Sequence, residues 1–239
     1  LDVLQMRAAE SEFPFLSAKI RYKSDGTTPE DFGIRPYTIV TVNNVQIGII
    51  GLTTTHTPTT TNPVNVAQFD FIDYETALRE VVPHVKAAGA EMVVVPGHIC
   101  RGELERLAEA VSDLGIHLLG GGHCNELFAS QIHDIVLLEG GSALASYAFA
   151  TFEFDTVTDT VVSVEYGVQY NNDGPADPAV EAIVSRWEAE ANAELNRVIG
   201  FSDQGLLQRS PGMQSLITEA WLWAYPTADV AITNLGGMR

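Results

Sequence analysis

The sequence predicts an α/β fold that contains some antiparallel sheet. Two short apolar runs, Met92–Val95 and Ile116–Leu119, have the length and composition of strands that are buried on both faces. Each run follows a segment with helical spacing of apolar residues, Tyr74–Ala88 for the first and Glu103–Leu114 for the second. From Ile135 to about Tyr170 the pattern changes to period two with frequent turn residues, which indicates antiparallel strands. Together these patterns favour the α/β class.

A β-hairpin is predicted ahead of these units. Ile39–Val42 and Val45–Leu52 are apolar and rich in β-branched residues, and Asn43-Asn44 separates them. Asparagine tolerates positive φ, which the tight turn of a two-residue hairpin requires. The following segment, Thr53–Pro63, is rich in threonine and proline and is predicted to be a loop.

Both predicted helices carry one apolar face. The face of the first consists of Ala77, Leu78, Val81, Val82 and Val85. The face of the second consists of Leu104, Leu107, Ala108 and Val111. Gly89 and Gly115 follow the two helices, at positions where glycine commonly ends a helix.

The remainder of the chain is predicted to be antiparallel strands followed by helices. The strands are Ala148–Phe154 and Val161–Tyr166, and the polar segment Asn171–Pro178 reads as a linker. The elements predicted after it are a helix over about Pro178–Val198, a helix over about Pro211–Tyr225 and a strand over Ala228–Thr233.

The bulk composition excludes several classes of function. The net charge is −18, with 31 acidic and 13 basic residues, so the summed field repels nucleic-acid polymers and anionic membranes. No apolar run approaches the roughly 20 residues that span a membrane. The two cysteines, Cys100 and Cys124, do not predict a disulfide framework. A phosphate-bearing substrate would need local cations here, such as bound metals and a few arginines.

Histidines follow both of the predicted buried strands. His98 comes after Pro96-Gly97, and His123 comes after three glycines, with Asn125 two residues further on. Ligands bind at the carboxyl edge of α/β sheets, and neutral imidazole is a good ligand for zinc, manganese or iron. We expect the glycines to let the backbone bend sharply. The alternative is a polar loop in which the histidines occur by chance.

Several segments resemble one known family. Gly121-Gly122-His123-Cys124-Asn125 is similar to the Gly-Gly-His-Ser-(His/Asn/Gln) motif of calcineurin-like metallophosphoesterases, and more narrowly to the 5′-nucleotidase family. The other similar segments, in chain order, are Phe13–Ile20 ("FPxLSANI"), Val45–Thr54 ("xKIGIIGLTT"), Pro96-Gly97-His98, Val198-Ile199-Gly200 and Asp229–Arg239 ("DIAITNGGGIR"). The resemblance therefore covers nearly the whole length.

The resemblance implies a domain organisation. Residues 1–172 would be the C-terminal portion of a four-layer α/β-β/α metallophosphoesterase domain. Residues 173–200 would be a linker helix, and residues 201–239 the beginning of an α/β substrate domain. The family's other metal motifs and its catalytic histidine are expected upstream of residue 1.

The resemblance also implies an activity and a site. The full protein would be a metal-dependent hydrolase of nucleotide phosphate monoesters, acting in nucleotide catabolism with two divalent ions, zinc or manganese. His98 and His123 would ligate one ion and Asn125 would contribute to the other. Substrate contacts would come from Asn234, Arg239 and Arg209. Family members of this kind are extracellular or periplasmic.

Other interpretations stay open. The full protein could instead be a 2′,3′-cyclic phosphodiesterase, a nucleotide-sugar hydrolase or a sulfur-ester hydrolase, or the chain could be a non-catalytic binding module. Cys124 replaces the family's serine, either as an inert buried thiol or as a metal-sensitive one. The other four histidines are not expected to be ligands, and His117 in particular is expected to pack in the core. They are His56, His84, His117 and His133.

Overall fold

The structure is a computed structural model that describes residues 2–172, 174–203 and 205–237. The chain divides into two compact units, Leu1–Gly174 and Pro175–Arg239, and each unit is described by itself.

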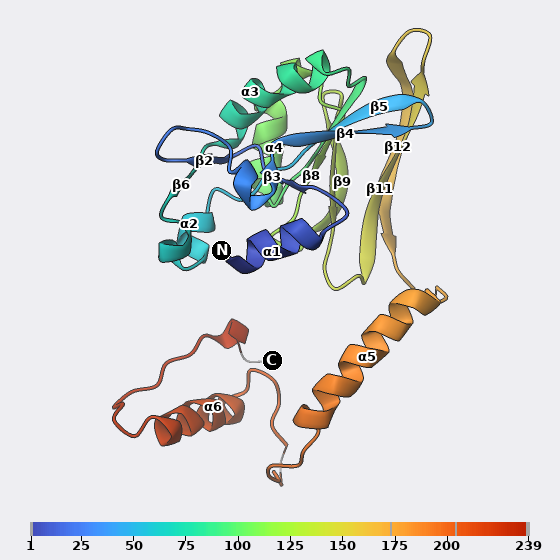
Figure 1. Ribbon diagram of the computed structural model, residues 1–239. Helices are drawn as coiled ribbons and strands as arrows, with labels where there is room; N and C mark the ends of the chain where they lie inside the picture. Colours follow the sequence, from blue (N-terminus) through green and yellow to red (C-terminus); the bar gives the residue numbers. More distant parts are fainter. Residues whose placement is uncertain (1, 173, 204, 238–239) are drawn as a thin grey trace. The chain divides into compact units, whose positions relative to one another are not determined.

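The helices and strands follow one another along the whole chain (Figure 1). The α-helices are α1 (Asp2–Glu10), α2 (Thr57–Thr60), α3 (Tyr74–Ala87), α4 (Arg101–Ala110), α5 (Pro178–Leu195) and α6 (Pro211–Ala224). The 3-10 helices are η1 (Glu30–Phe32), η2 (Pro63–Val66), η3 (Ser112–Leu114) and η4 (Leu235–Gly237). The strands are β1 (Phe15–Leu16), β2 (Ile20–Tyr22), β3 (Ile34–Arg35), β4 (Tyr37–Val42), β5 (Val45–Ile50), β6 (Phe69–Phe71), β7 (Met92–Pro96), β8 (Leu118–Gly120), β9 (Leu127–Ile132), β10 (Ile135–Gly140), β11 (Ser146–Asp155) and β12 (Thr160–Tyr170).

A six-stranded sheet organises the first unit, in the order β4-β5-β7-β8-β10-β9. Strands β5, β7, β8 and β10 run parallel, and β4 and β9 pair antiparallel at the two edges. Helices α3 and α4 pack on this sheet, and their predicted apolar faces are buried in one core with Val93, Val95 and Leu119. The predicted α/β class is confirmed, because four of the six strands are parallel and two helices pack on the sheet. The apolar run Met92–Val95 lies in β7, in the middle of this sheet.

The predicted hairpin is confirmed at β4 and β5. Asn43 and Asn44 have φ of 50° and 66°, as a turn with two left-handed residues requires. Two neighbouring predictions need correction. Thr53–Pro63 is not entirely loop, because α2 begins at Thr57 with a proline in its first turn. The strand predicted from Ile116 begins instead at Leu118, because Ile116 and His117, which follow η3 and Gly115, have irregular backbone.

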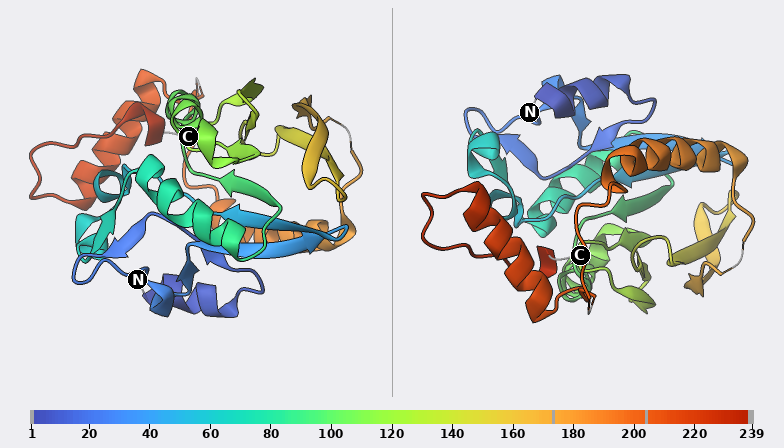
Figure 2. Two further views of the ribbon diagram at one scale, coloured as in Figure 1. Left: turned by 90° about the horizontal axis from the view of Figure 1, so that it is seen from above. Right: turned by 90° about the horizontal axis from the view of Figure 1, so that it is seen from below.

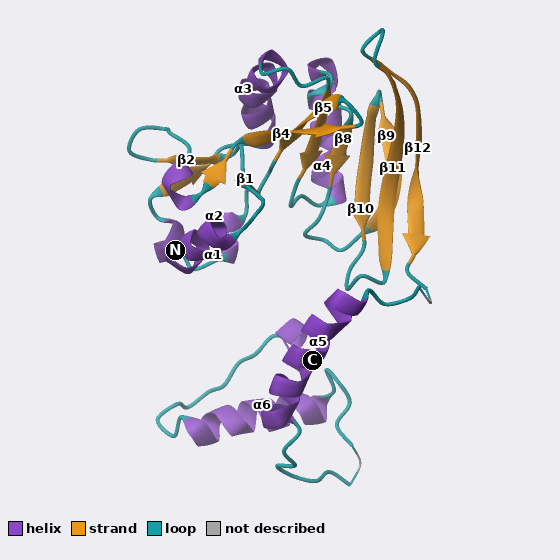
Figure 3. Ribbon diagram, turned by 45° about the vertical axis from the view of Figure 1, so that its right-hand side comes forward, coloured by secondary structure: helices purple, strands orange, loops and turns teal. Residues whose placement is uncertain are grey.

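Strands β11 and β12 form a long antiparallel hairpin that packs against β9 and β10 (Figure 3). The sequence pattern located this hairpin but missed β9, which pairs with β10. On the other side of the unit, α1 and the small pair β1–β3 lie beside the β4 edge (Figure 2). The pair β2–β6 forms a further small sheet, in which Arg21 of β2 contacts Glu80 of α3. The first unit therefore places the carboxyl ends of β7 and β8 in the middle of its main sheet.

The second unit contains the two predicted helices. Asp177 caps α5, with Pro178 at its first position, and Ser210 caps α6 by accepting a hydrogen bond from the Met213 N–H. The strand predicted over Ala228–Thr233 is wrong. This segment is irregular, with Val230 69% and Ile232 84% exposed, and the described part of the unit contains no strand with which it could pair. Among the described residues, no helix is both long enough and apolar enough to span a bilayer.

Candidate metal centre

The candidate site lies where β7 and β8 end. The two strands are parallel neighbours, with Val95 opposite Leu119 and Pro96 opposite Gly120. Their carboxyl ends therefore stop at the same level of the sheet, and the loops that follow start side by side. The His98 N–H also donates to the Leu52 carbonyl at 2.8 Å, so the end of β5 holds this loop from the other side.

The two predicted histidines meet at this edge. His123 Nδ1 lies 2.9 Å from His98 Nε2, and the two ring centroids are 4.6 Å apart. Partial burial and the neighbouring His123 lower the pKa of His98, in that order of size. A lowered pKa favours the neutral imidazole, which is the form that binds metals.

The separation of the two ring nitrogens fits a shared metal. Two nitrogens bound to one zinc ion at about 2.0–2.1 Å each lie roughly 2.9–3.4 Å apart. The two nitrogens share a hydrogen bond in this structure, so binding of one ion by both would require loss of the shared proton and rotation of the rings toward the ion. Within the described residues, no third His, Cys, Asp or Glu side chain joins them to form a metal-binding cluster. The pair is therefore a candidate for part of a metal centre.

The glycines before the histidines act differently from the prediction. Gly97 and Gly122 do not adopt positive φ, whereas His123 and Asn125 do, at 74° and 58°. A Cβ added to Gly122 would lie 3.3 Å from the Gly97 carbonyl oxygen and 3.5 Å from His98 Nδ1. The glycines therefore allow the two loops to approach closely. The backbone bend falls on His123 itself, and left-handed backbone at a residue other than glycine is concentrated at functional sites.

A buried carboxylate supports the second loop. Glu139, at the end of β10, is 2% exposed, and its Oε1 accepts a hydrogen bond from the Glu126 N–H at 2.9 Å. Burial raises the pKa of Glu139, against the effect of the Glu126 and Asn125 N–H groups. The sequence reasoning missed this residue. Its signal was an acidic residue directly after the apolar run Ile135–Leu138, in a strand predicted to be buried.

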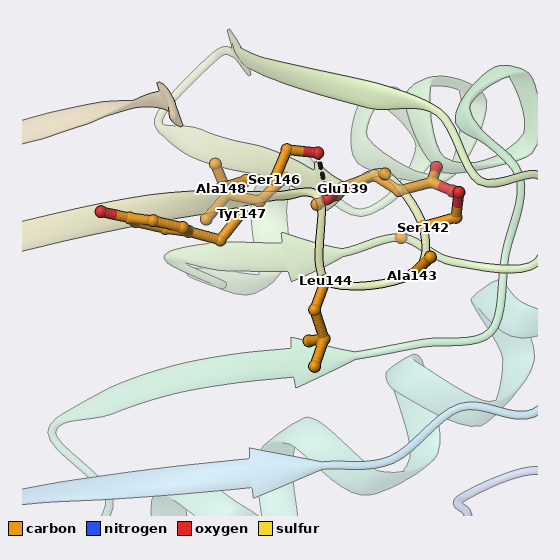
Figure 4. A pocket seen from close by; sticks show the side chains of 11 residues that line it. Glu139, Ser142, Ala143, Leu144, Ser146, Tyr147 and Ala148 are labelled. Atoms are coloured by element: carbon orange, nitrogen blue, oxygen red, sulfur yellow. Dashed lines mark hydrogen bonds between the residues drawn. The ribbon is translucent and has the colours of Figure 1, made fainter. Parts of the chain in front are cut away.

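Glu139 also lines a cavity of about 460 Å³, together with residues between β10 and β11 (Figure 4). The cavity wall includes Gly121 and the turn between β10 and β11. Ser146 Oγ closes that turn by donating to the Gly140 carbonyl at 2.9 Å, and Ala143 and Leu144 both have φ of 56°. Glu139 is therefore shared between this cavity and the loop after β8, from which it accepts the Glu126 N–H.

The two cysteines correct the sequence interpretation most clearly. Cys100 and Cys124 form a disulfide, with their Cα atoms 5.2 Å apart, so Cys124 is neither an inert nor a metal-sensitive thiol. A separation of 24 residues in the sequence gave no sign of this pairing. It results from the adjacency of β7 and β8, which brings together the loops that follow them.

The other predicted site residues are less constrained. Asn125 is exposed, beside His123 in the same loop. Arg209 and Asn234 are exposed residues of the second unit, and Arg209 has φ of 62°. Arg239 lies outside the described residues. The roles assigned to these four side chains stay predictions.

The remaining histidines lie away from the pair. His117 is half-buried rather than part of the core; its Nδ1 accepts a hydrogen bond from the Val93 N–H at 3.1 Å, and burial lowers its pKa. His133 Nε2 lies 2.7 Å from Glu109 Oε2. His56 and His84 are exposed, at the start of α2 and within α3.

Comparison with known proteins finds relatives that align with nearly the whole chain. The chain is 27% identical to the 5′-nucleotidase of Bos taurus and 27% identical to the 5′-nucleotidase of Homo sapiens. Each of these two alignments covers 96% of this chain and 46% of the relative. The chain is a relative of the 5′-nucleotidases. It spans about half the length of the curated relatives that it matches. No known protein-family profile matches the chain.

Solved structures show the same fold for this relative of the 5′-nucleotidases. The 5′-nucleotidase precursor of Thermus thermophilus superimposes with a TM-score of 0.70 at 20% identity, over 93% of this chain and 48% of that one. The calcineurin-like phosphoesterase YfkN of Bacillus subtilis superimposes with a TM-score of 0.70 at 17% identity, over 82% and 68%. The predicted metallophosphoesterase fold is therefore confirmed for the part of the domain that this chain contains.

Proposed function

We propose that the full protein hydrolyses phosphate monoesters of nucleotides with the help of two divalent metal ions, zinc or manganese. The observation that carries this proposal is the His98–His123 pair. Its ring nitrogens lie 2.9 Å apart at the ends of adjacent parallel strands, in a chain related to the 5′-nucleotidases. The relatives are named 5′-nucleotidases, and the proposal applies the substrate class in that name to this protein.

Each residue of the pair has a defined part in this proposal. His98 and His123 bind one ion through Nε2 and Nδ1, the nitrogens that face each other. Asn125, on the same loop, reaches the second ion with its amide oxygen. When bound, the two ions polarise the phosphoryl oxygens and activate the attacking water. In the second unit, Arg209, Asn234 and Arg239 contact the substrate, since the arginine fork matches anionic oxygens.

The strongly acidic composition makes the local cations important. With a net charge of −18, the chain repels an anionic substrate over long distances, so substrate must be held by short-range contacts to metal and arginine. We therefore expect binding of a small phosphate ester and no binding of nucleic-acid polymers.

We also propose an extracellular or periplasmic location. The Cys100–Cys124 disulfide supports this location, because structural disulfides persist in oxidising compartments and are rare in the cytosol. This argument is independent of the resemblance to the family.

A substrate panel tests the proposed activity. The full-length polypeptide, supplied with Zn²⁺ or Mn²⁺, is expected to hydrolyse nucleoside 5′-monophosphates faster than 2′,3′-cyclic nucleotides or nucleotide sugars. Consumption of each ester and formation of its products are followed by chromatography with each metal and after removal of metal by a chelator, because the cyclic and sugar esters release no inorganic phosphate when they are hydrolysed. Preference for a cyclic diester or a nucleotide sugar would replace the proposed substrate, and no turnover of any ester would favour a non-catalytic binding module.

A further inference from the structure

The two histidine loops are joined by a covalent bond. Cys100 lies two residues after His98, Cys124 directly follows His123, and the two cysteines form a disulfide. The bond therefore joins the loop after β7 to the loop after β8. Because Cys100 also precedes the first residue of α4, it ties both loops to the start of that helix.

Hydrogen bonds hold the inner part of the two loops. The Gly97 N–H donates to the Gly120 carbonyl at 2.8 Å, and the Gly122 N–H donates to the Ile99 carbonyl at 2.9 Å. Beyond Gly122 the second loop turns outward, and residues 123–126 are exposed. The disulfide acts in this outer stretch, where His123 adopts a left-handed backbone conformation.

The far end of the same stretch is held from two sides. The Arg101 N–H, at the start of α4, donates to Glu126 Oε2 at 3.1 Å, and the Glu126 N–H donates to Glu139 Oε1 at 2.9 Å. The disulfide therefore lies between the two left-handed residues, His123 and Asn125, and the Glu126 contacts follow them. Without the disulfide, the backbone of His123 has no covalent restraint to the β7 loop and is free to leave its strained conformation.

We infer that Cys100 and Cys124 are positioning residues whose disulfide holds His98 and His123 at the separation that one metal ion requires. This inference rests on the proposed metal-dependent function. It adds Cys100 and Cys124 to the residues on which metal binding depends. Groups that orient metal ligands without touching the metal contribute to affinity because the ligands then lose little freedom on binding. Breaking the bond accordingly weakens cation binding at this centre.

Removal of the disulfide is tested with the double variant Cys100→Ser/Cys124→Ser in the full-length polypeptide. The affinity of the metal-free protein for Mn²⁺ is measured by calorimetric titration, and the melting temperature is recorded alongside. Mn²⁺ is the probe because it prefers oxygen and nitrogen to sulfur ligands. The expected result is a Kd at least about 10-fold weaker than that of the wild type, as found when residues that orient metal ligands are replaced.

Reduction of the wild type is the second arm. A dithiol reagent donates two electrons to the disulfide. Each cysteine sulfur takes up one proton, and the reagent becomes a cyclic disulfide. The Mn²⁺ affinity is expected to fall as it does in the double variant and to return when the reagent is removed and the cysteines are reoxidised.

A matched control separates positioning from general stability. Val82 is buried in α3, outside the two loops, and Val82→Ala removes core packing without touching either cysteine. This variant is expected to lower the melting temperature and to leave the Mn²⁺ affinity unchanged. The inference is overturned if the double serine variant binds Mn²⁺ as tightly as the wild type does. It is also overturned if Val82→Ala loses the same affinity. Failure of the wild type itself to bind Mn²⁺ would overturn the proposed function together with this inference.

Discussion

Replacing His123 with alanine is expected to lower the rate of nucleotide hydrolysis by more than about 100-fold, because even residues that only orient metal ligands are worth 10- to 100-fold. His123 presents Nδ1 toward His98 Nε2 at 2.9 Å, so the substitution removes half of the observed pair. The measurement is kcat/KM for a nucleoside 5′-monophosphate at saturating metal, with the full-length polypeptide.

His133→Ala is the control for this substitution. It removes the same kind of side chain from an exposed position, where His133 contacts Glu109 and is remote from the candidate site. Its kcat/KM is expected to equal that of the wild type. Undiminished turnover in His123→Ala would show that the histidine pair takes no part in the reaction.

Replacing Lys19 with methionine is expected to stabilise the protein at neutral pH. Lys19 is 0% exposed, and its Nζ lies 3.7 Å from the centroid of the Tyr74 ring. Burial lowers its pKa from 10.5 to about 8, while Asp73 and Glu103 act in the opposite direction. Methionine fills a similar volume without a charge, so the variant avoids the free energy spent on burying the ammonium group. Part of the gain is offset by loss of the cation–π contact, worth about 1–2 kcal/mol.

The lowered pKa of Lys19 makes the free energy of unfolding depend on pH. Between the folded pKa near 8 and the unfolded value of 10.5, the unfolded chain holds a proton that the folded chain has released. The free energy of unfolding therefore rises with pH in this window and is lowest below pH 8. From pH 7 to pH 9.5 the lysine adds about 2 kcal/mol, at 1.36 kcal/mol per pH unit.

Urea unfolding at pH 7 and pH 9.5 measures this effect. The wild type is expected to gain stability with pH, and Lys19→Met is expected to lack that gain. Lys23→Met, at an exposed lysine, is the control and is expected to behave like the wild type. An equal pH dependence in wild type and Lys19→Met would show that Lys19 titrates normally in the folded protein.

The prediction of the His98–His123 pair depends on a local sequence pattern. Buried parallel strands read as continuous apolar runs, and the residues after two such runs meet at one sheet edge. This pattern predicts that His98 and His123 lie together, and in the structure His123 Nδ1 is 2.9 Å from His98 Nε2.

The features that the sequence did not predict depend on contacts between segments that are distant in the chain. The pairing of Cys100 with Cys124 follows from the order of strands in the sheet, and the role of Glu139 follows from the path of a loop that it meets only after folding. The strand predicted over Ala228–Thr233 failed for the related reason that an apolar run becomes a strand only when a partner is present. Its pattern was correct for a strand, but the described part of the second unit supplies no neighbour.

Metal content tests the central claim most directly. The full-length wild-type polypeptide, loaded with Zn²⁺ or Mn²⁺ and freed of excess ions, is expected to retain about two ions per chain, as two-metal phosphoesterases do. The double variant His98→Ala/His123→Ala is expected to retain about one ion or fewer, because one centre loses two nitrogen ligands. Equal metal content in the two proteins would contradict the assignment of His98 and His123 as metal ligands.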